Sequence, residues 1–244
     1  MKRTFADLHL CVNIRDESAT QAIISKAATL GYKQIAIQLP AETRTEEISQ
    51  LKSQCKASGL DFASRVDVRP RSQNDLLGML RRLRRRFEVI CVQCDNKEIA
   101  RHAAKDRRVD LLNFPQLDYH KRFFDKAEAE LASSSLATLE VDVKPIILLK
   151  GPQRIRFLAC LRREVAVAKE FHMPIIVSSG VSEPILMRRP REAALLSSLF
   201  GLEGNAALDA VSVNAATIVA RNREKMSPDF IAPGIRLIKQ GEDC

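Results

Sequence analysis

The feature that most constrains the fold of this chain is the repeated alternation of two sequence patterns. Short apolar runs are each followed by a polar or Pro/Gly break and then by a segment of helical periodicity. The predicted strands cover residues 4–11, 34–39, 61–68, 88–94, 111–114, 138–143, 175–178 and 210–213. The predicted helices lie near residues 18–30, 44–58, 72–86, 96–105, 119–132, 153–171, 190–200 and 214–225. This order is typical of parallel βαβ units, because each helix returns the chain to the same end of the sheet.

The number of units predicts the fold class. Eight units in 244 residues fit a closed α/β (β/α)8 TIM-barrel-like fold better than an open sheet, since such barrels take about 250 residues. The fourth and fifth units are short, which allows a distorted barrel. A chain of this length can also form two small domains, but no low-complexity tract divides it. We predict a single domain over residues 1–226, followed by a C-terminal strap over residues 227–244.

Composition excludes several protein classes. With 45% hydrophobic and 28% charged residues, the chain is neither disordered nor membrane-embedded, and no apolar run is long enough for a transmembrane helix. Asp7 stands where a signal peptide would need apolar residues. The six cysteines are scattered and are expected to be free thiols in a reducing compartment. We therefore expect a cytoplasmic protein that makes no use of a membrane.

Polar residues at the carboxyl ends of the strands are the candidates for function, because barrel sites form there. Asp7 and His9 are two residues apart on one strand, so both side chains are predicted to face the same side. Only Asp67, Glu140 and Asp142 could add oxygen ligands, and one histidine with carboxylates is a poor transition-metal set. We expect hydrogen-bonding roles, with no catalytic residue, metal or cofactor, although a residual metal site at Asp7 and His9 stays open.

Two further motifs are weak. Cys91 and Cys94 form a CxxC pattern, but residues three apart on a strand face opposite sides, which favours two buried thiols over zinc. The Ser-Ser-Gly at residues 178–180 lacks the flanking pattern of a nucleophile elbow and is predicted to be a polar strand end that turns at glycine.

The charge balance suggests a polyanionic partner. The chain carries 39 Lys and Arg against 30 Asp and Glu, a formal charge of +9, while Trp is absent and Tyr occurs twice. An aromatic platform for stacking bases is therefore not expected. Basic residues follow the third, sixth and seventh strands, and the candidate RNA contacts among them are Arg65, Arg69, Arg71, Lys144, Arg154, Arg188, Arg189 and Arg191. Arginine predominates among them, which favours bidentate contact with phosphates. The alternative is that these residues are ordinary surface charge.

The most conspicuous charge cluster is the run RRLRRR at residues 81–86. It occupies the last turn of a predicted helix, where cations interact favourably with the helix dipole. In a barrel, this turn lies at the end opposite the strand tops. A solvated face and a polyanion contact both remain open for it.

An ordered set of short segments resembles a known family. The segments are FADLH at 5–9, SRVD at 64–67, VDLLNF at 109–114, VSSG at 177–180, LMRRPR at 186–191 and AVSVNA at 210–215. Together they are similar to the thirty-kilodalton protein subunit of ribonuclease P, known in archaea as protein component 3, over about residues 4 to 223. The resemblance rests on the whole ordered set of segments.

The resemblance implies a barrel related to the polymerase-and-histidinol-phosphatase (PHP) superfamily of metal-dependent phosphoesterases. That superfamily begins with a His-x-His pair, whereas this chain has Asp7 and His9 there. Residues 178–181 read Ser-Ser-Gly-Val where such enzymes carry Asp-x-His. These departures imply that metal catalysis is absent.

The family role that the resemblance implies is assistance to a catalytic RNA. The complex removes the 5′ leader from precursor tRNA, and the expected partners are ribonuclease P RNA, precursor tRNA, protein component 2 and other protein subunits. The resemblance places RNA contact on Arg65, Arg188, Arg189 and Arg191, whereas Arg69, Lys144 and Arg154 rest on their position alone.

Two competing hypotheses remain at this point. One is a stand-alone metal-dependent phosphoesterase of the PHP superfamily, suggested by His9, Glu140 and Asp142 together with Asp7 at predicted strand ends. The other is an assembly scaffold that contacts only proteins, with the helix that carries residues 81–86 as a docking surface.

Overall fold

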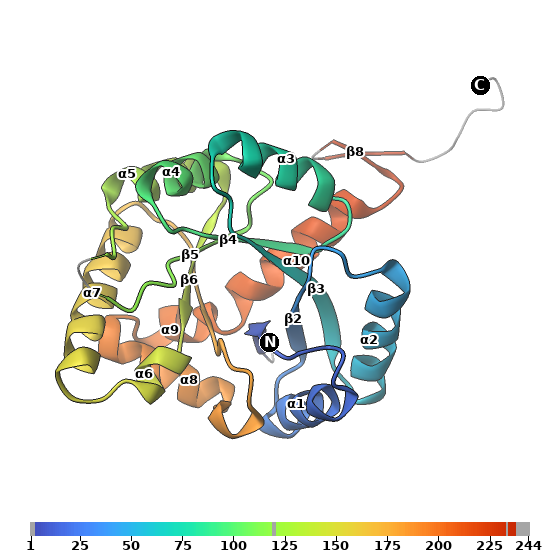
Figure 1. Ribbon diagram of the computed structural model, residues 1–244, viewed down its shortest axis with the longest axis horizontal. Helices are drawn as coiled ribbons and strands as arrows, with labels where there is room; N and C mark the ends of the chain where they lie inside the picture. Colours follow the sequence, from blue (N-terminus) through green and yellow to red (C-terminus); the bar gives the residue numbers. More distant parts are fainter. Residues whose placement is uncertain (1–2, 119–120, 233, 238–244) are drawn as a thin grey trace.

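Seven parallel strands build the central sheet of the computed structural model, which describes residues 3–118, 121–232 and 234–237. In sheet order the strands are β1 (Ala6–Leu10), β2 (Gln34–Leu39), β3 (Asp61–Val68), β4 (Val89–Gln93), β5 (Leu111–Asn113), β6 (Thr138–Asp142) and β7 (Ile175–Ser178). The sheet curls until its edges approach, and Leu10 forms a parallel bridge with Val181 just after β7. The nearly closed barrel, seen down its axis in Figure 1, confirms the predicted TIM-barrel-like class.

Helices cover the outside of the barrel (Figure 1). They are α1 (Glu17–Leu30), α2 (Thr45–Ala57), α3 (Gln73–Leu83), α4 (Lys97–Lys105), α5 (Lys126–Ser135), α6 (Lys144–Leu148), α7 (Gly151–Glu170), α8 (Pro190–Ser197) and α9 (Gly204–Ala210). Four of them begin at a side chain that accepts a backbone N–H from the first turn: Asp16 for α1, Ser72 for α3, Asn96 for α4 and Asp125 for α5. Local sequence signals therefore set these helix starts.

The predicted eighth strand at residues 210–213 is wrong. Helix α9 ends at Ala210 and α10 (Val213–Met226) begins three residues later. One strand-like contact remains, because the Ala6 N–H donates to the Val211 carbonyl at 3.0 Å. The apolar residues that follow recur with helical rather than two-residue spacing, so this segment continues as a helix.

Helix α10 closes the end of the barrel opposite the strand tops. Its residues Ala215, Ile218 and Val219 are buried, and burying a side chain such as Ile218 stabilises the fold by roughly 1.5–3 kcal/mol. They pack in one cluster with residues of the strands, namely Ala6, Leu8, Ala36, Ala63, Val89, Cys91, Leu111 and Ile176. Figure 1 shows α10 crossing behind the strands. Helix α10 thus covers the bottom of the barrel, whereas the segments that end β1 and follow β7 bond directly to each other.

The C-terminal segment forms a small hairpin after α10. Its strands β8 (Phe230–Ala232) and β9 (Ile235–Arg236) pair in an antiparallel manner, and Arg236 forms an ion pair with Glu224 of α10. Residues 238–244 of the predicted strap lie outside the described part of the chain. Among the described residues, no helix is both long and apolar enough to cross a membrane.

Candidate functional site

A bulge in β1 places His9 at the mouth of the barrel. Between Asp7 and Leu10, β1 contains one residue more than the paired stretch of β2. Leu8 therefore packs in the barrel interior, whereas Leu10 packs in the core between sheet and helices. The expectation that Asp7 and His9 face the same side is wrong, because the bulge interrupts the two-residue alternation of the strand.

Asp7 joins β1 to the segment that follows β7. Its Oδ1 accepts the N–H groups of His9 at 3.1 Å and of Ser179 at 3.0 Å. Its Oδ2 is buried and has no hydrogen-bond partner among the described residues. Burial raises the pKa of Asp7. This carboxyl group thus helps to close the barrel.

Arg65 lies fully buried at the centre of a charge network. Its Nε donates to Asp67 Oδ1 at 2.6 Å, and its Nη2 donates to Asp67 Oδ2 at 3.2 Å. The same guanidinium binds both oxygens of Glu140, through Nη1 at 2.6 Å and Nη2 at 2.7 Å. Nη1 also donates to the Leu8 carbonyl at 2.7 Å. These contacts can use all five N–H donors of the guanidinium.

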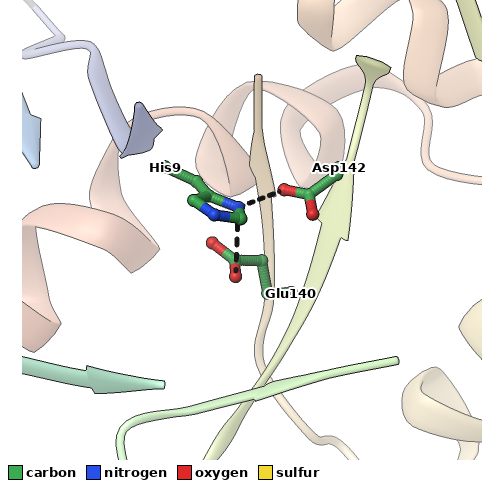
Figure 2. Close-up of side chains that lie close together, drawn as sticks. All are labelled: His9, Glu140 and Asp142. Atoms are coloured by element: carbon green, nitrogen blue, oxygen red, sulfur yellow. Dashed lines mark hydrogen bonds and ion pairs between the residues drawn. The ribbon is translucent and has the colours of Figure 1, made fainter. Parts of the chain in front are cut away.

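The other side chains of the network complete the hydrogen bonding of its carboxylates. Ser178 donates to Glu140 Oε1 at 2.8 Å. Asn113 bridges two acids, since its Nδ2 contacts Glu140 Oε2 at 3.0 Å and Asp142 Oδ2 at 2.9 Å. His9 Nδ1 lies 2.8 Å from Asp142 Oδ1 and 3.9 Å from Glu140 Oε2. Figure 2 shows the His9 ring between these two acids.

The network stabilises the charged forms of its members. For His9, burial and the Arg65 charge act to lower the pKa, but Asp142 and Glu140 outweigh them and hold it well above its ordinary range. For Glu140, burial acts to raise the pKa, but Arg65 and His9 hold it below the usual value. The pKa of Asp142 is lowered against burial, chiefly by His9. The mouth therefore holds alternating positive and negative groups.

The network does not fit a metal ion while Arg65 is in place. Among the described residues, His9, Glu140 and Asp142 offer three possible ligand atoms within 4.8 Å of one another. Both Glu140 oxygens already accept from Arg65, and the Asp142 oxygens accept from His9 and Asn113. A metal ion would have to displace these donors. The metal that a PHP-type barrel implies has no free ligand set at this position.

The two weak motifs have structural roles. Ser178 and Ser179 donate to Glu140 and to the His9 carbonyl. At Gly180, where φ is +64°, a Cβ atom would lie 2.8 Å from the Asp142 Cγ, so glycine permits this close approach. Cys91 faces the barrel interior, whereas Cys94 packs in the outer core, which confirms that they point to opposite sides as free thiols.

The structure contradicts the prediction that Arg65 contacts RNA. The side chain has 0% exposure, and its guanidinium binds Asp67 and Glu140. The sequence could not distinguish a buried arginine from a surface one, because the acids that bind it come from two strands. One signal for burial was available. Ala63, Arg65 and Asp67 are two residues apart on one strand, so the two charged side chains share the inward face of apolar Ala63.

The other predicted contacts lie in loops and helix starts at the mouth end of the barrel. Arg71, Arg189 and Arg191 are exposed, and Lys144 is half-buried. Arg69 is exposed but is paired with Asp95 at 3.0 Å. Arg154 and Arg188 instead bind backbone near them. Arg154 donates to the Leu149 carbonyl, and Arg188 donates to the carbonyls of Ile185 and Met187.

The arginine run divides into two groups. Arg84 is bound to Asp110 at 2.5 Å and to three backbone carbonyls. Arg86 donates to Ala41 and Thr43, in the loop after β2. The prediction that the whole run lies at the end opposite the strand tops is therefore wrong for Arg86. The reason is that β4, which follows the run, begins opposite Arg65, near the end of β3. The remaining members of the run, Arg81, Arg82 and Arg85, are exposed.

A cleft at the mouth was not predicted. It has a volume of about 960 Å³ and lies between the loops that follow β1 and β2. Arg15 and Arg44 line it beside Glu42 and Glu47, and Asp67 reaches it from the charge network. Loop residues of this kind carry no periodic signal, which is why the sequence did not single them out.

Comparison with known proteins identifies the family. A family model described as RNase P subunit p30 matches residues 4–227. The chain belongs to the RNase P subunit p30 family. It is 24% identical over 226 residues to the ribonuclease P protein component 3 of Methanosarcina barkeri, covering 93% of this chain and 92% of that protein. It is 27% identical over 188 residues to the component 3 of Haloarcula marismortui, covering 77% and 79% of the two chains.

Solved structures agree on the fold. A chain in a cryo-EM structure of archaeal ribonuclease P with mature tRNA superposes with a TM-score of 0.81 at 20% identity, covering 98% of this chain and 100% of that one. A 2-pyrone-4,6-dicarboxylic acid hydrolase from Acinetobacter baumannii gives a TM-score of 0.57 at 10% identity, covering 89% and 99% of the two chains. Membership of the RNase P subunit p30 family confirms the expected ribonuclease P subunit and does not favour a stand-alone phosphoesterase.

Proposed function

We propose that this RNase P subunit p30 protein assists a catalytic RNA in removing the 5′ leader from precursor tRNA, and that it does so by binding RNA phosphates rather than by performing the chemistry. The family membership carries this proposal. The relatives named ribonuclease P protein component 3 match most of the chain, and the superposed archaeal chain comes from a complex with mature tRNA.

The state of the barrel mouth supports a non-catalytic role. General acid–base or metal catalysis needs polar groups that are free to contact a substrate. The acids of this mouth are instead bound to Arg65, Asn113 and His9 within the protein. They are committed to holding the barrel together.

The exposed basic residues at the same end support RNA contact. Arg71, Arg189 and Arg191 have no side-chain ion pair with any described residue, so their guanidinium groups are available to phosphates. Lys144 adds a positive charge after β6. Arginines of this kind would recognise the shape and backbone of folded RNA rather than its base sequence. Arg69 would contribute only by exchanging Asp95 for a phosphate.

The proposed partners are ribonuclease P RNA, precursor tRNA, protein component 2 and other protein subunits. A pure assembly scaffold makes a different prediction, because its crosslinks to RNA would be confined to neighbouring subunits. Photo-crosslinking of the assembled complex therefore distinguishes the two roles. Crosslinks from the segment around residues 189–191 to RNA would support direct binding.

Reconstitution tests the function. Precursor tRNA is incubated with ribonuclease P RNA and component 2, with and without this protein, beside a lane that holds the protein alone. We expect faster leader removal at limiting Mg²⁺ when the protein is present, because it screens phosphate repulsion. The protein alone should cleave nothing. Equal rates with and without the protein, or cleavage in the protein-only lane, would contradict the proposal.

A further inference from the structure

The centre of the barrel mouth resembles a cation-binding site that the protein fills with its own side chain. The carboxylates of Asp67 and Glu140 converge on one guanidinium, with His9 and Asp142 beside them. We propose that Arg65 supplies the positive charge that a divalent cation would otherwise bring, and that removal of its side chain frees Glu140 to hold a metal ion together with His9 and Asp142.

The hydrogen-bond geometry supports this substitution. The Arg65 guanidinium contacts both oxygens of Glu140 and both of Asp67, which is how a cation at this position would be enclosed. His9 Nε2 lies 3.6 Å from Asp67 Oδ2, and its Nδ1 lies 2.8 Å from Asp142 Oδ1. Carboxylate oxygens dominate this set, which favours Mn²⁺, and a site with one histidine nitrogen would hold Zn²⁺ less well.

The charges of the cluster support it as well. Arg65 is the only arginine or lysine that pairs with Asp67 or Glu140 among the described residues. An arginine stays charged under all ordinary conditions, so it neutralises these buried acids permanently. Without it, two buried carboxylates lose their principal counter-charge, which is costly unless another cation enters.

The surroundings provide access for an ion. The cleft of about 960 Å³ reaches Asp67 from the side of β1 and β2. A second pocket, of about 280 Å³, is lined by Glu140, Asp142 and Asn113 from the side of β5 and β6. An ion could therefore reach Glu140 and Asp142 without opening the barrel.

The test compares Arg65→Ala with Arg122→Ala in the full chain. Arg122 is an apt control because it is also a buried arginine paired with a buried acid, Glu164, but lies outside the three-ligand cluster. Each protein is melted in EDTA and in Mn²⁺ or Zn²⁺, and bound metal is counted by elemental analysis. For Arg65→Ala we expect one ion per chain and a Tm rise of roughly 5–10 °C at an ion concentration about 100 times the Kd.

The controls should behave differently. Wild type and Arg122→Ala should show no ion-dependent change in Tm, and Arg65→Lys, which keeps a positive charge, should bind no ion. Adding His9→Ala to Arg65→Ala should abolish the metal response. The proposal fails if Arg65→Ala ignores the ions, if it cannot be recovered folded even with metal present, or if wild type binds an ion equally well.

Discussion

At the scale of single residues, the barrel mouth depends on partners that are several strands apart in the sequence. His9 comes from β1, Arg65 from β3 and Glu140 from β6, yet they share one set of hydrogen bonds. Breaking a buried charge pair from one side typically costs about 3–5 kcal/mol, because the other charge is left uncompensated. Substituting any one of these residues should therefore also destabilise the charged partners that it leaves in the barrel mouth.

His9 gives the stability of the protein a specific pH dependence. Its pKa in the folded state is raised well above that of the unfolded chain, so protonated His9 stabilises the fold fully below about pH 6.5. That contribution is lost as pH rises toward the folded pKa. In His9→Gln it is absent at every pH. The stability gap between wild type and His9→Gln should therefore be widest at pH 6 and narrow by up to about 1.4 kcal/mol per pH unit above 6.5.

Urea unfolding at pH 6, 7.5 and 9 measures this gap. His172→Gln serves as the control, because it makes the same chemical change at an exposed histidine. Its stability should follow that of wild type at each pH. Parallel curves for wild type and His9→Gln would show that His9 is not held protonated by Asp142 and Glu140.

At the scale of elements, the buried Asp110 links helix α10 to the end of α3. Helix α10 closes the bottom through apolar residues and through Asn222, whose Nδ2 donates to the buried Asp110. The same Asp110 binds Arg84, just after α3. Part of the arginine run therefore stabilises the fold, and the rest is free for contact with a partner.

Substitutions in the run should separate these two roles. Arg84→Ala removes the hydrogen bonds to Asp110 and to three carbonyls, so we expect unfolding free energy to fall by about 2–4 kcal/mol. Arg82→Ala, at an exposed position of the same segment, should stay within about 0.5 kcal/mol of wild type. Thermal and denaturant unfolding of both variants checks this. Equal decreases would mean that the exposed arginines also stabilise α3.

At the scale of the whole molecule, the charge of +9 attracts any polyanion, so position must be separated from net charge. Arg189→Glu with Arg191→Glu changes the rim at the start of α8, where acidic residues also suit the helix dipole. Lys33→Glu with Lys56→Glu makes the same change in net charge near the opposite end of the strands, at exposed residues. The two double variants therefore carry the same change in net charge at different places. Because Lys56 lies in the last turn of α2, where glutamate opposes the helix dipole, thermal unfolding checks that both variants are folded.

Arg189→Glu with Arg191→Glu, the rim variant, should bind ribonuclease P RNA more weakly than wild type. Lys33→Glu with Lys56→Glu should keep the specific affinity of wild type. If both arginines bind phosphates, the slope of log K against log salt should become shallower by about 1 for each phosphate interaction that the substitutions remove. Affinity for ribonuclease P RNA, measured at several salt concentrations, gives that slope. Comparable decreases in affinity for both variants would indicate a general charge effect and would contradict the rim assignment.

The local pattern of the chain predicted most of its elements. The strands β2, β3 and β7 begin and end as expected, and seven of the eight predicted strands are present. Such elements follow from apolar periodicity and from capping residues. Both signals lie within a few positions of the element, so a short stretch of sequence is enough to read them. The family resemblance likewise rests on short segments in order.

Only the tertiary structure decided three features of this protein. They are the burial of Arg65, the bulge that turns His9 inward, and the helix α10 at the bottom of the barrel in place of the predicted eighth strand. Each depends on which side chains the closing barrel brings together: Asp67 and Glu140 around Arg65, Asp142 beside His9, and the inner strand residues against Ile218. The sequence by itself determined the alternating elements, the excess of positive charge and the family. It could not assign the buried arginine, because a charged side chain is stable inside a protein only where all its counter-charges are in place, and Glu140 lies 75 residues away in the sequence.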